Sequence, residues 1–152
     1  MPATLSLEAR INVSKVGIEW SGIIGAIQDN GDFERGALLG VHNDHFFLAI
    51  ASEQKSKLTY LETPTKLTPG KAYHLVGTFD GKNMKLFVDG KLVGVSSAQA
   101  GAVVFEQASW LSAGIYKDEN DHLPLTGILS KAAIFRGALS TDAIRRRALE
   151  SP

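Results

Sequence analysis

The sequence predicts an all-β protein, a two-sheet antiparallel β-sandwich with one short C-terminal helix. Short runs in which apolar and polar residues alternate recur along the 152-residue chain. Turn-forming residues, chiefly Asp, Asn and Gly, separate these runs, and helical periodicity is confined to the C-terminal end. About ten or more short strands at roughly regular spacing are typical of a sandwich.

The first half of the chain predicts strands and one hairpin. Residues 4–12 alternate between apolar and polar side chains, which indicates a half-buried strand. Residues 20–28 predict a second strand, whose glycines indicate bulges, and 29–32 is a turn-rich loop. A hairpin is expected over 35–52, and a shorter strand over 57–62.

The strongest local signal is a three-stranded meander over 73–96. It contains two Asp-Gly pairs, Asp80-Gly81 and Asp89-Gly90, flanked by alternating apolar residues. Tight hairpin turns need positive φ, which Gly adopts at little cost, so the pairs predict turns. Asp80 and Asp89 are therefore expected to form turns and not to bind ligands.

Beyond residue 96 the pattern predicts loops and strands, followed by a helix. The expected order is a loop over 97–102, a short strand over 103–105, a strand over 110–116, a polar loop over 117–124 and a last strand over 125–135. A helix is expected over 140–149, because Ser140 suits the N-cap and three arginines complement the C-terminal dipole.

Composition excludes several classes of function. Sixteen basic and sixteen acidic residues give zero formal charge, so we expect no nucleic-acid partner and no electrostatic membrane attachment. The absence of cysteine excludes disulfides, zinc–thiolate sites and thiol catalysis. No apolar run approaches the roughly 20 residues that cross a bilayer, so we expect no membrane insertion. The start has no signal-peptide pattern. Residues 1–152 are expected to be a single domain, excised from a larger protein.

Two segments carry a family resemblance. Residues 74–81 (HLVGTFDG) with 86–93 (LFVDGKLV) resemble the signature hairpins of laminin-G-like domains, which are concanavalin A-like jelly rolls. Residues 127–144 (GILSKAAIFRGALSTDAI) are similar to that family's closing strand, turn and terminal helix. The resemblance implies one concave and one convex sheet, with ligands on rim loops or on the concave face. Ser130 and Lys131 stand where the family often has an Asp-Glu pair.

Catalysis has little support in the sequence. A glycosidase needs two carboxyl groups flanking the scissile bond, and the family's glucanases carry theirs at alternate positions of one strand. Asp32 and Glu34 are two residues apart, but beside a turn. No Gly-x-Ser-x-Gly motif is present. His74 is expected to be structural, and His42 and His45 to face solvent. We expect no enzyme.

Two oxygen-rich loops could hold calcium, which prefers six to eight oxygen ligands. The candidate ligands are Asp29, Asp32, Asp118 and Asp121. Their spacing does not match an EF-hand, and polar surface turns are the alternative interpretation.

The second of these loops is also the candidate glycan site. Its proposed ligand-binding residues are Tyr116, Asp118, Asn120 and His122, with Tyr116 as a stacking or orienting ring. Trp20, Tyr60 and Trp110 are further aromatic candidates, although such residues in strands more often pack.

We therefore expect a non-catalytic binding or adhesion module, with glycan as the leading ligand class by resemblance. The first alternative is a structural or protein-interaction domain that packs on a neighbouring catalytic domain. An atypical glycosidase is the third possibility. The resemblance also implies an extracellular or cell-envelope location.

Overall fold

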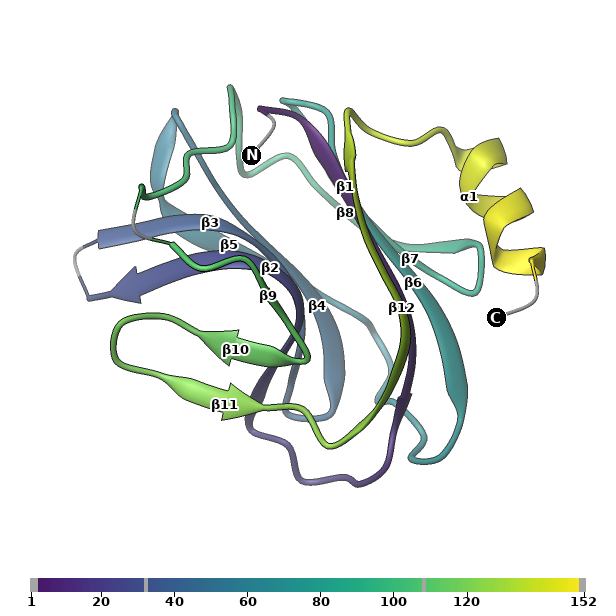
Figure 1. The fold of residues 1–152 in the computed structure, drawn as a ribbon. Helices are drawn as coiled ribbons and strands as arrows, with labels where there is room; N and C mark the ends of the chain where they lie inside the picture. Colours follow the sequence, from purple (N-terminus) through teal and green to yellow (C-terminus); the bar gives the residue numbers. More distant parts are fainter. Residues whose placement is uncertain (1–2, 32, 108, 151–152) are drawn as a thin grey trace.

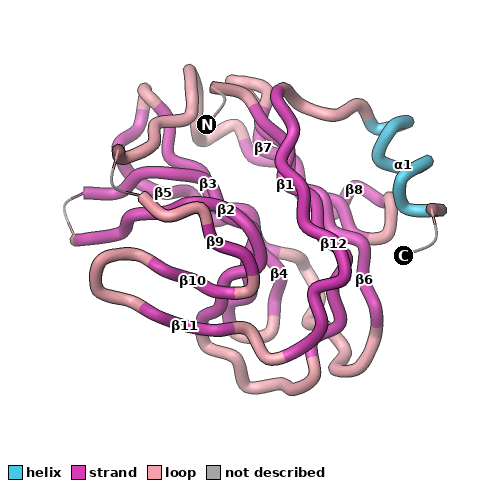
Figure 2. Tube along the Cα trace, in the orientation of Figure 1, coloured by secondary structure: helices cyan, strands magenta, loops and turns pink. Residues whose placement is uncertain are grey.

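A computed structural model describes residues 3–31, 33–107 and 109–150. Two five-stranded antiparallel sheets pack face to face, and a small two-stranded hairpin lies beside one of them (Figures 1 and 2). One helix, near the C-terminus, is present in these ranges and lies against the outside of the other sheet (Figure 1). The predicted sandwich is confirmed.

The first sheet, called sheet A, has the strand order β12-β1-β6-β7-β8. Its strands are β1 (Leu5–Val13), β6 (Ala72–Phe79), β7 (Met84–Val88), β8 (Lys91–Ser96) and β12 (Gly127–Arg136). The first and last long strands of the chain therefore pair with each other, with Leu5 opposite Arg136.

The second sheet, called sheet B, has the order β5-β4-β3-β2-β9. Its strands are β2 (Trp20–Asn30), β3 (Phe33–His42), β4 (His45–Ser52), β5 (Lys55–Glu62) and β9 (Ser112–Ala113). The separate hairpin consists of β10 (Ile115–Lys117) and β11 (His122–Pro124).

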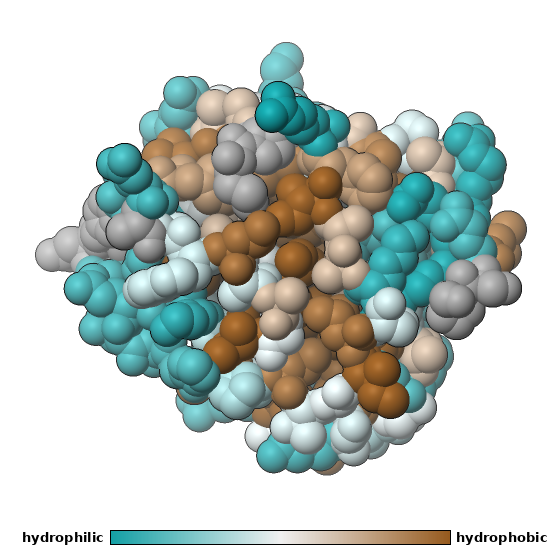
Figure 3. Space-filling view, viewed as in Figure 1, coloured by the Kyte–Doolittle hydropathy of each residue, from teal (hydrophilic) through white to brown (hydrophobic). Residues whose placement is uncertain are grey.

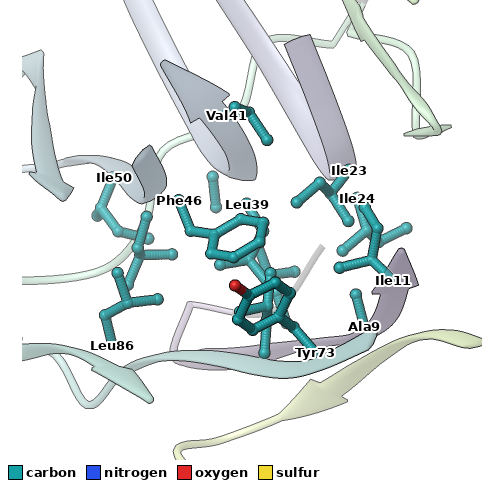
Figure 4. Packing of buried hydrophobic residues seen from close by; sticks show 14 of the residues in the cluster. Ala9, Ile11, Ile23, Ile24, Leu39, Val41, Phe46, Ile50, Tyr73 and Leu86 are labelled. Atoms are coloured by element: carbon teal, nitrogen blue, oxygen red, sulfur yellow. The ribbon is translucent and has the colours of Figure 1, made fainter. Parts of the chain in front are cut away.

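The main core lies between the two sheets. Alternate residues of β1, such as Leu5 and Leu7, meet residues of sheet B such as Leu39 and Leu48 in one buried cluster. Figure 4 shows Phe46 of sheet B facing Tyr73 of sheet A, with ring centroids 5.0 Å apart. Fully burying each large apolar side chain stabilises the fold by about 1.5–3 kcal/mol.

Sheet B is buried on its outer face as well. Residues that alternate with the core positions, such as Leu38, Phe47 and Ala49, form a second apolar cluster there. Tyr116 of β10 and Leu123 of β11 pack against the same cluster. The β10–β11 hairpin therefore covers part of the outer face of sheet B.

The Asp-Gly turns are confirmed. The Asp80 carboxylate accepts the backbone N–H groups of Lys82 and Asn83 at 2.9 and 2.7 Å. Asp89 has a φ of 50°, and its carboxylate accepts the His74 N–H at 2.9 Å. Both carboxylates are used by the scaffold.

The region between 103 and 124 differs from the prediction. The strand expected over 110–116 is wrong as one element, because Gly114 at φ 74° turns the chain between β9 and β10. The loop expected over 117–124 is largely a hairpin. The expected strand over 103–105 contributes only an isolated bridge between Val103 and Ser52 in the described structure.

Helix α1 (Thr141–Leu149) begins one residue later than expected, because Ser140 is its N-cap and accepts the Ala143 N–H. Its one fully buried residue, Ile144, packs against Val76 and Phe87 on the outer face of sheet A. An apolar contact thus holds the helix on that sheet.

A buried carboxylate fastens the other end of the helix. Glu8 is fully buried, and the Arg147 guanidinium and the His74 ring donate to it at 2.8 Å each. Lys131 adds an ion pair at 3.4 Å. Burial alone would raise the pKa of Glu8, but the bonds from Arg147 and His74 outweigh it and lower the pKa to about 2. His74 is therefore structural, as expected.

Candidate ligand-binding site

A pocket of about 290 Å³ lies on the outer face of sheet B, beside the β10–β11 hairpin. Its lining combines aromatic rings with carboxylates: Glu19, Trp20, Asp29, Tyr60, Tyr116, Asp121 and Leu123. These residues come from β2 and the residue before it, from β5, and from the hairpin and its turn. Only the folded topology brings these segments together.

Cross-strand register builds the aromatic wall. Trp20 lies directly opposite His42 in the β2–β3 pair, so their rings share one face and stack at 3.8 Å between centroids. The edges of Tyr60 and Phe47 meet Trp20 at 5.4 and 5.7 Å. Such T-shaped contacts hold the half-buried Trp20 ring in a fixed orientation.

Asp29 is the least exposed of the three carboxylates that line the pocket. Its Oδ2 accepts long hydrogen bonds from the hydroxyls of Tyr60 and Tyr116, at 3.4 Å each. Burial raises the pKa of the Asp29 carboxyl, and the charges of Glu34 and Asp118 raise it further. Burial also raises the pKa of both tyrosines, so their hydroxyls remain protonated donors.

The rim beside the pocket is closed by hydrogen bonds. One carboxylate oxygen of Asp118 accepts the N–H groups of Asn120 and Asp121 at 2.8 and 2.7 Å. The other accepts the Asp29 N–H at 3.3 Å. Asn30 and Asn120 pair through their side-chain amides at 2.9 Å. The turn of the hairpin is therefore tied to the end of β2.

A glycine allows the hairpin to lie close to β2. A Cβ added to Gly22 would lie on the backbone carbonyl of Ile115, the first residue of β10. The Ser21 hydroxyl also reaches the Leu123 carbonyl, at 3.5 Å. The hairpin thus seats directly on the backbone of sheet B.

The structure brings the two predicted loops together, but it assigns their residues differently. Tyr116 is 4% exposed and its hydroxyl bonds Asp29 at 3.4 Å, so of its two predicted roles the orienting one fits this position better, and its contact with a ligand stays a prediction. Asp118 is 1% exposed and bonded to backbone N–H groups, so it forms the turn. Asn120 is exposed and bonds Asn30, whereas His122 is exposed and outside the pocket lining.

The residue that sequence reasoning underrated is Trp20. Its indole lines the pocket, and its signal was position, directly before a run of buried residues in β2. Glu19 was missed altogether. His42 was expected to face solvent, but it stacks on Trp20 and bonds the Glu62 carboxylate at 2.5 Å.

The candidate calcium ligands that lie in the described structure differ in their contacts. Asp29 and Asp121 line the pocket, Asp118 is occupied by N–H groups, and Asp32 lies outside the described residues. Within the described ranges, no group of three or more His, Asp or Glu side chains is arranged to hold a metal ion. Calcium binding at this rim stays a prediction.

Other hollows adjoin or compete with this pocket, including one of about 320 Å³ bordered by Arg10, His74 and Ile128. One of about 310 Å³ shares Glu19, Trp20 and Leu123 with it, so Trp20 separates two neighbouring depressions. Another, of about 350 Å³, lies elsewhere and is bordered by Lys66, Lys71 and Lys91. Its phenol, Tyr73, is 9% exposed and accepts a backbone N–H. The Trp20 pocket is the stronger candidate because it offers an accessible ring beside polar groups.

The fold and this face define a jelly-roll domain with an aromatic, acidic pocket on one sheet. The chain belongs to the concanavalin A-like lectin/glucanase superfamily, whose laminin-G-like model matches residues 2–145. A curated relative, pappalysin-1 of Mus musculus, is 28% identical over 78 residues. That match covers 46% of this chain and 5% of the relative.

Solved structures share the fold at low identity. A Bacteroides ovatus protein described as a candidate carbohydrate-binding protein superposes with a TM-score of 0.73 at 15% identity, over 99% of this chain and 42% of that one. The CBM40 of the Ruminococcus gnavus IT-sialidase, bound to α2,3-sialyllactose, gives 0.71 at 14%, over 97% and 83%. Domain 4 of an extracellular arabinanase from Geobacillus stearothermophilus, with arabinotriose, gives 0.70 at 16%, over 96% and 66%.

Within the described residues, no helix is long and apolar enough to cross a membrane. The helix found there, α1, is far shorter and more polar than a membrane-spanning helix.

Proposed function

We propose that this domain is a non-catalytic carbohydrate-binding module. The observation that carries the proposal is the half-buried Trp20 ring, fixed by His42 and Tyr60 at the edge of a polar pocket. A sugar ring would lie against the part of the indole that lines the pocket and that His42 does not cover. The carboxylates of Asp29 and Asp121 would accept its hydroxyl groups, and charge-assisted hydrogen bonds of this kind are strong.

Two relatives support a binding role over a catalytic one. The sialidase CBM40 and the arabinanase domain each hold a sugar, and the match covers 83% and 66% of those chains. Within this chain, Asp29 is held by two tyrosine hydroxyls and Asp118 by backbone N–H groups. We therefore assign neither carboxylate a role in bond cleavage.

The proposal places the domain in a larger extracellular or cell-envelope protein. The chain spans 5% of pappalysin-1 and 42% of the Bacteroides ovatus protein. A domain of this size would serve there as an accessory module that holds its parent protein on a glycan.

A matched pair of tryptophan variants tests the proposal. Trp20→Ala should reduce binding on a glycan array by at least about tenfold, a loss typical of removing an aromatic anchor. Trp110→Ala is the control, because Trp110 is 47% exposed but lies outside the pocket lining. Equal binding by Trp20→Ala and wild type would contradict the site. Release of reducing sugar from a bound glycan would contradict the non-catalytic role.

A second candidate function is docking against a neighbouring domain. Trp110, Leu111 and Ile128 are 47%, 61% and 65% exposed, which is unusual for large apolar side chains. Figure 3 shows hydrophobic residues gathered across the middle of the face it draws. In the full-length protein, Leu111→Ser should increase proteolysis between domains if this surface docks. Unchanged proteolysis would remove this candidate.

A further inference from the structure

The Trp20 pocket has one sign of charge. Three of its lining residues, Glu19, Asp29 and Asp121, carry carboxylates, and the described lining contains no Lys, Arg or His. An anionic sugar would need a cation here, as carboxylate recognition in proteins usually relies on Arg or Lys. This lining offers none.

The basic side chains around the pocket have other partners, and His42, which stacks on Trp20, bonds the Glu62 carboxylate. Lys57 pairs with Glu34 at 3.2 Å and donates to the Gly31 carbonyl at 3.0 Å. Lys117 lies 4.5 Å from the centroid of the Trp110 ring. Lys15 lines the adjoining hollow and not the pocket itself. The negative charge of the pocket is therefore not neutralised from within its lining.

The partial burial of Asp29 strengthens the attraction between its carboxylate and a cationic group on a ligand. Its carboxylate is partly buried, and its two phenol partners are distant at 3.4 Å, so it is poorly compensated. Burial raises the pKa of Asp29, and the negative charges of Glu34 and Asp118 raise it further. A ligand ammonium would supply that charge, whereas a ligand carboxylate would add repulsion in a partly desolvated site.

The aromatic side chain of Trp20 also favours a cationic ligand. An ammonium group is attracted to the face of an indole ring within about 6 Å, and Trp gives the strongest such attraction among aromatic residues. Trp20 lines the same pocket as the three carboxylates. Trp20 and the three carboxylates therefore favour the same cationic group on a bound ligand.

We infer that the pocket selects sugars that carry a free amine over neutral sugars, and rejects sugars that carry a carboxylate. This inference rests on the proposed function. It separates the chain from the Ruminococcus gnavus CBM40, which shares the fold and is bound to sialyllactose. A glucosamine oligomer is the probe that carries the required chemistry.

Isothermal titration with four oligosaccharides tests the inference. At about pH 6, where a sugar amine is largely protonated, a glucosamine trimer should bind about tenfold more tightly than the N-acetylglucosamine trimer. Lactose should bind more tightly than 3′-sialyllactose. Added salt should weaken the glucosamine complex most, because its extra contact is ionic.

Asp29→Asn identifies the carboxylate responsible. The substitution keeps the side-chain shape and the backbone N–H that bonds Asp118. It should abolish the preference for the amine, so that the glucosamine trimer then binds no more tightly than the N-acetyl trimer. Asp142→Asn is the matched control, because Asp142 lies on α1 with an 80% exposed side chain.

The possible outcomes separate the two claims. Sugar binding that needs Trp20 but shows no amine preference would overturn the inference and leave the proposed function standing. Tighter binding of sialyllactose than of lactose would overturn it too. If no sugar binds and Trp20→Ala changes nothing, both claims fall.

Discussion

Glu8 and Asp29 occupy similar places on opposite sides of the sandwich, and their surroundings are opposite. Each is an acidic residue on the outer face of a sheet beneath a covering element, α1 for Glu8 and the β10–β11 hairpin for Asp29. Glu8 has Arg147, His74 and Lys131 within 3.4 Å. Among the described residues, the side-chain partners of the Asp29 carboxylate are two phenol hydroxyls at 3.4 Å.

The difference separates a structural carboxylate from one that is available to a ligand. Cations lower the pKa of Glu8 to about 2, whereas burial raises the pKa of Asp29. Proteins often retain such poorly compensated groups where function needs them, at some cost in stability. Variants at these two carboxylates, and at the elements that cover them, test the difference.

Removing the charge of Glu8 should have the largest effect. Glu8→Gln leaves Arg147 and Lys131 without their shared anion and should destabilise the fold by about 2–4 kcal/mol. The partial exposure of both cations, 26% and 32%, keeps the loss below that of a fully buried pair. Urea unfolding measures it. An unchanged midpoint would show that the network does not hold α1.

The stability of the fold should depend on pH through the protonation of the Glu8 carboxylate. Its folded pKa of about 2 lies below the reference value of 4.5, so its contribution is fully present above about pH 5. The contribution should disappear as the pH falls toward 2. The stability difference between wild type and Glu8→Gln should therefore shrink over that window. A constant difference would contradict the assignment.

Loss of the helix cap should have a smaller effect. Ser140→Ala removes the acceptor for the Ala143 N–H and should cost about 1 kcal/mol, because N-cap substitutions typically cost this much. Ser140→Asp is the control that keeps an acceptor. Thermal unfolding compares the two variants, and equal melting temperatures would contradict the capping role.

Asp29→Asn should act in the opposite direction to Glu8→Gln. The raised pKa of Asp29 means that ionisation is penalised in the folded state, fully so above that pKa and less as the pH falls through it. At neutral pH the amide should therefore stabilise the fold slightly, by less than about 1 kcal/mol. A clear loss of stability would show that the Asp29 charge is needed structurally.

Calcium should have the smallest effect, if it binds. The sequence predicts that Asp29, Asp32, Asp118 and Asp121 contribute ligands, so millimolar calcium should raise the melting midpoint above that in chelator. Asp121→Asn should reduce the calcium-induced rise, because it removes one predicted ligand carboxylate. The side chain of Asp121 is exposed, so the substitution should leave the fold itself unchanged. Identical midpoints with calcium and chelator would remove the calcium prediction.

Local patterns predicted the sandwich well, because alternation and Asp-Gly turns act over a few residues. The segment 110–116 failed since one glycine, Gly114, reverses the chain inside an apolar run. The pocket was only half predictable. The structure brings the two predicted polar loops together, but Trp20 and Tyr60 meet through the register of four strands, which no local pattern encodes.

The hairpin over 115–124 has a consequence for how such domains diverge. It supplies Tyr116, Asp121 and Leu123 to the pocket, yet it pairs with no strand of either five-stranded sheet. Its seat combines the bare backbone of Gly22 with the bonds that Asp118 and Asn120 make to the end of β2. Natural variation or loop grafting within these ten positions would therefore exchange one wall of the pocket while the inherited framework stays intact. Ligand specificity can therefore change through substitutions in the hairpin, without substitutions in the two five-stranded sheets.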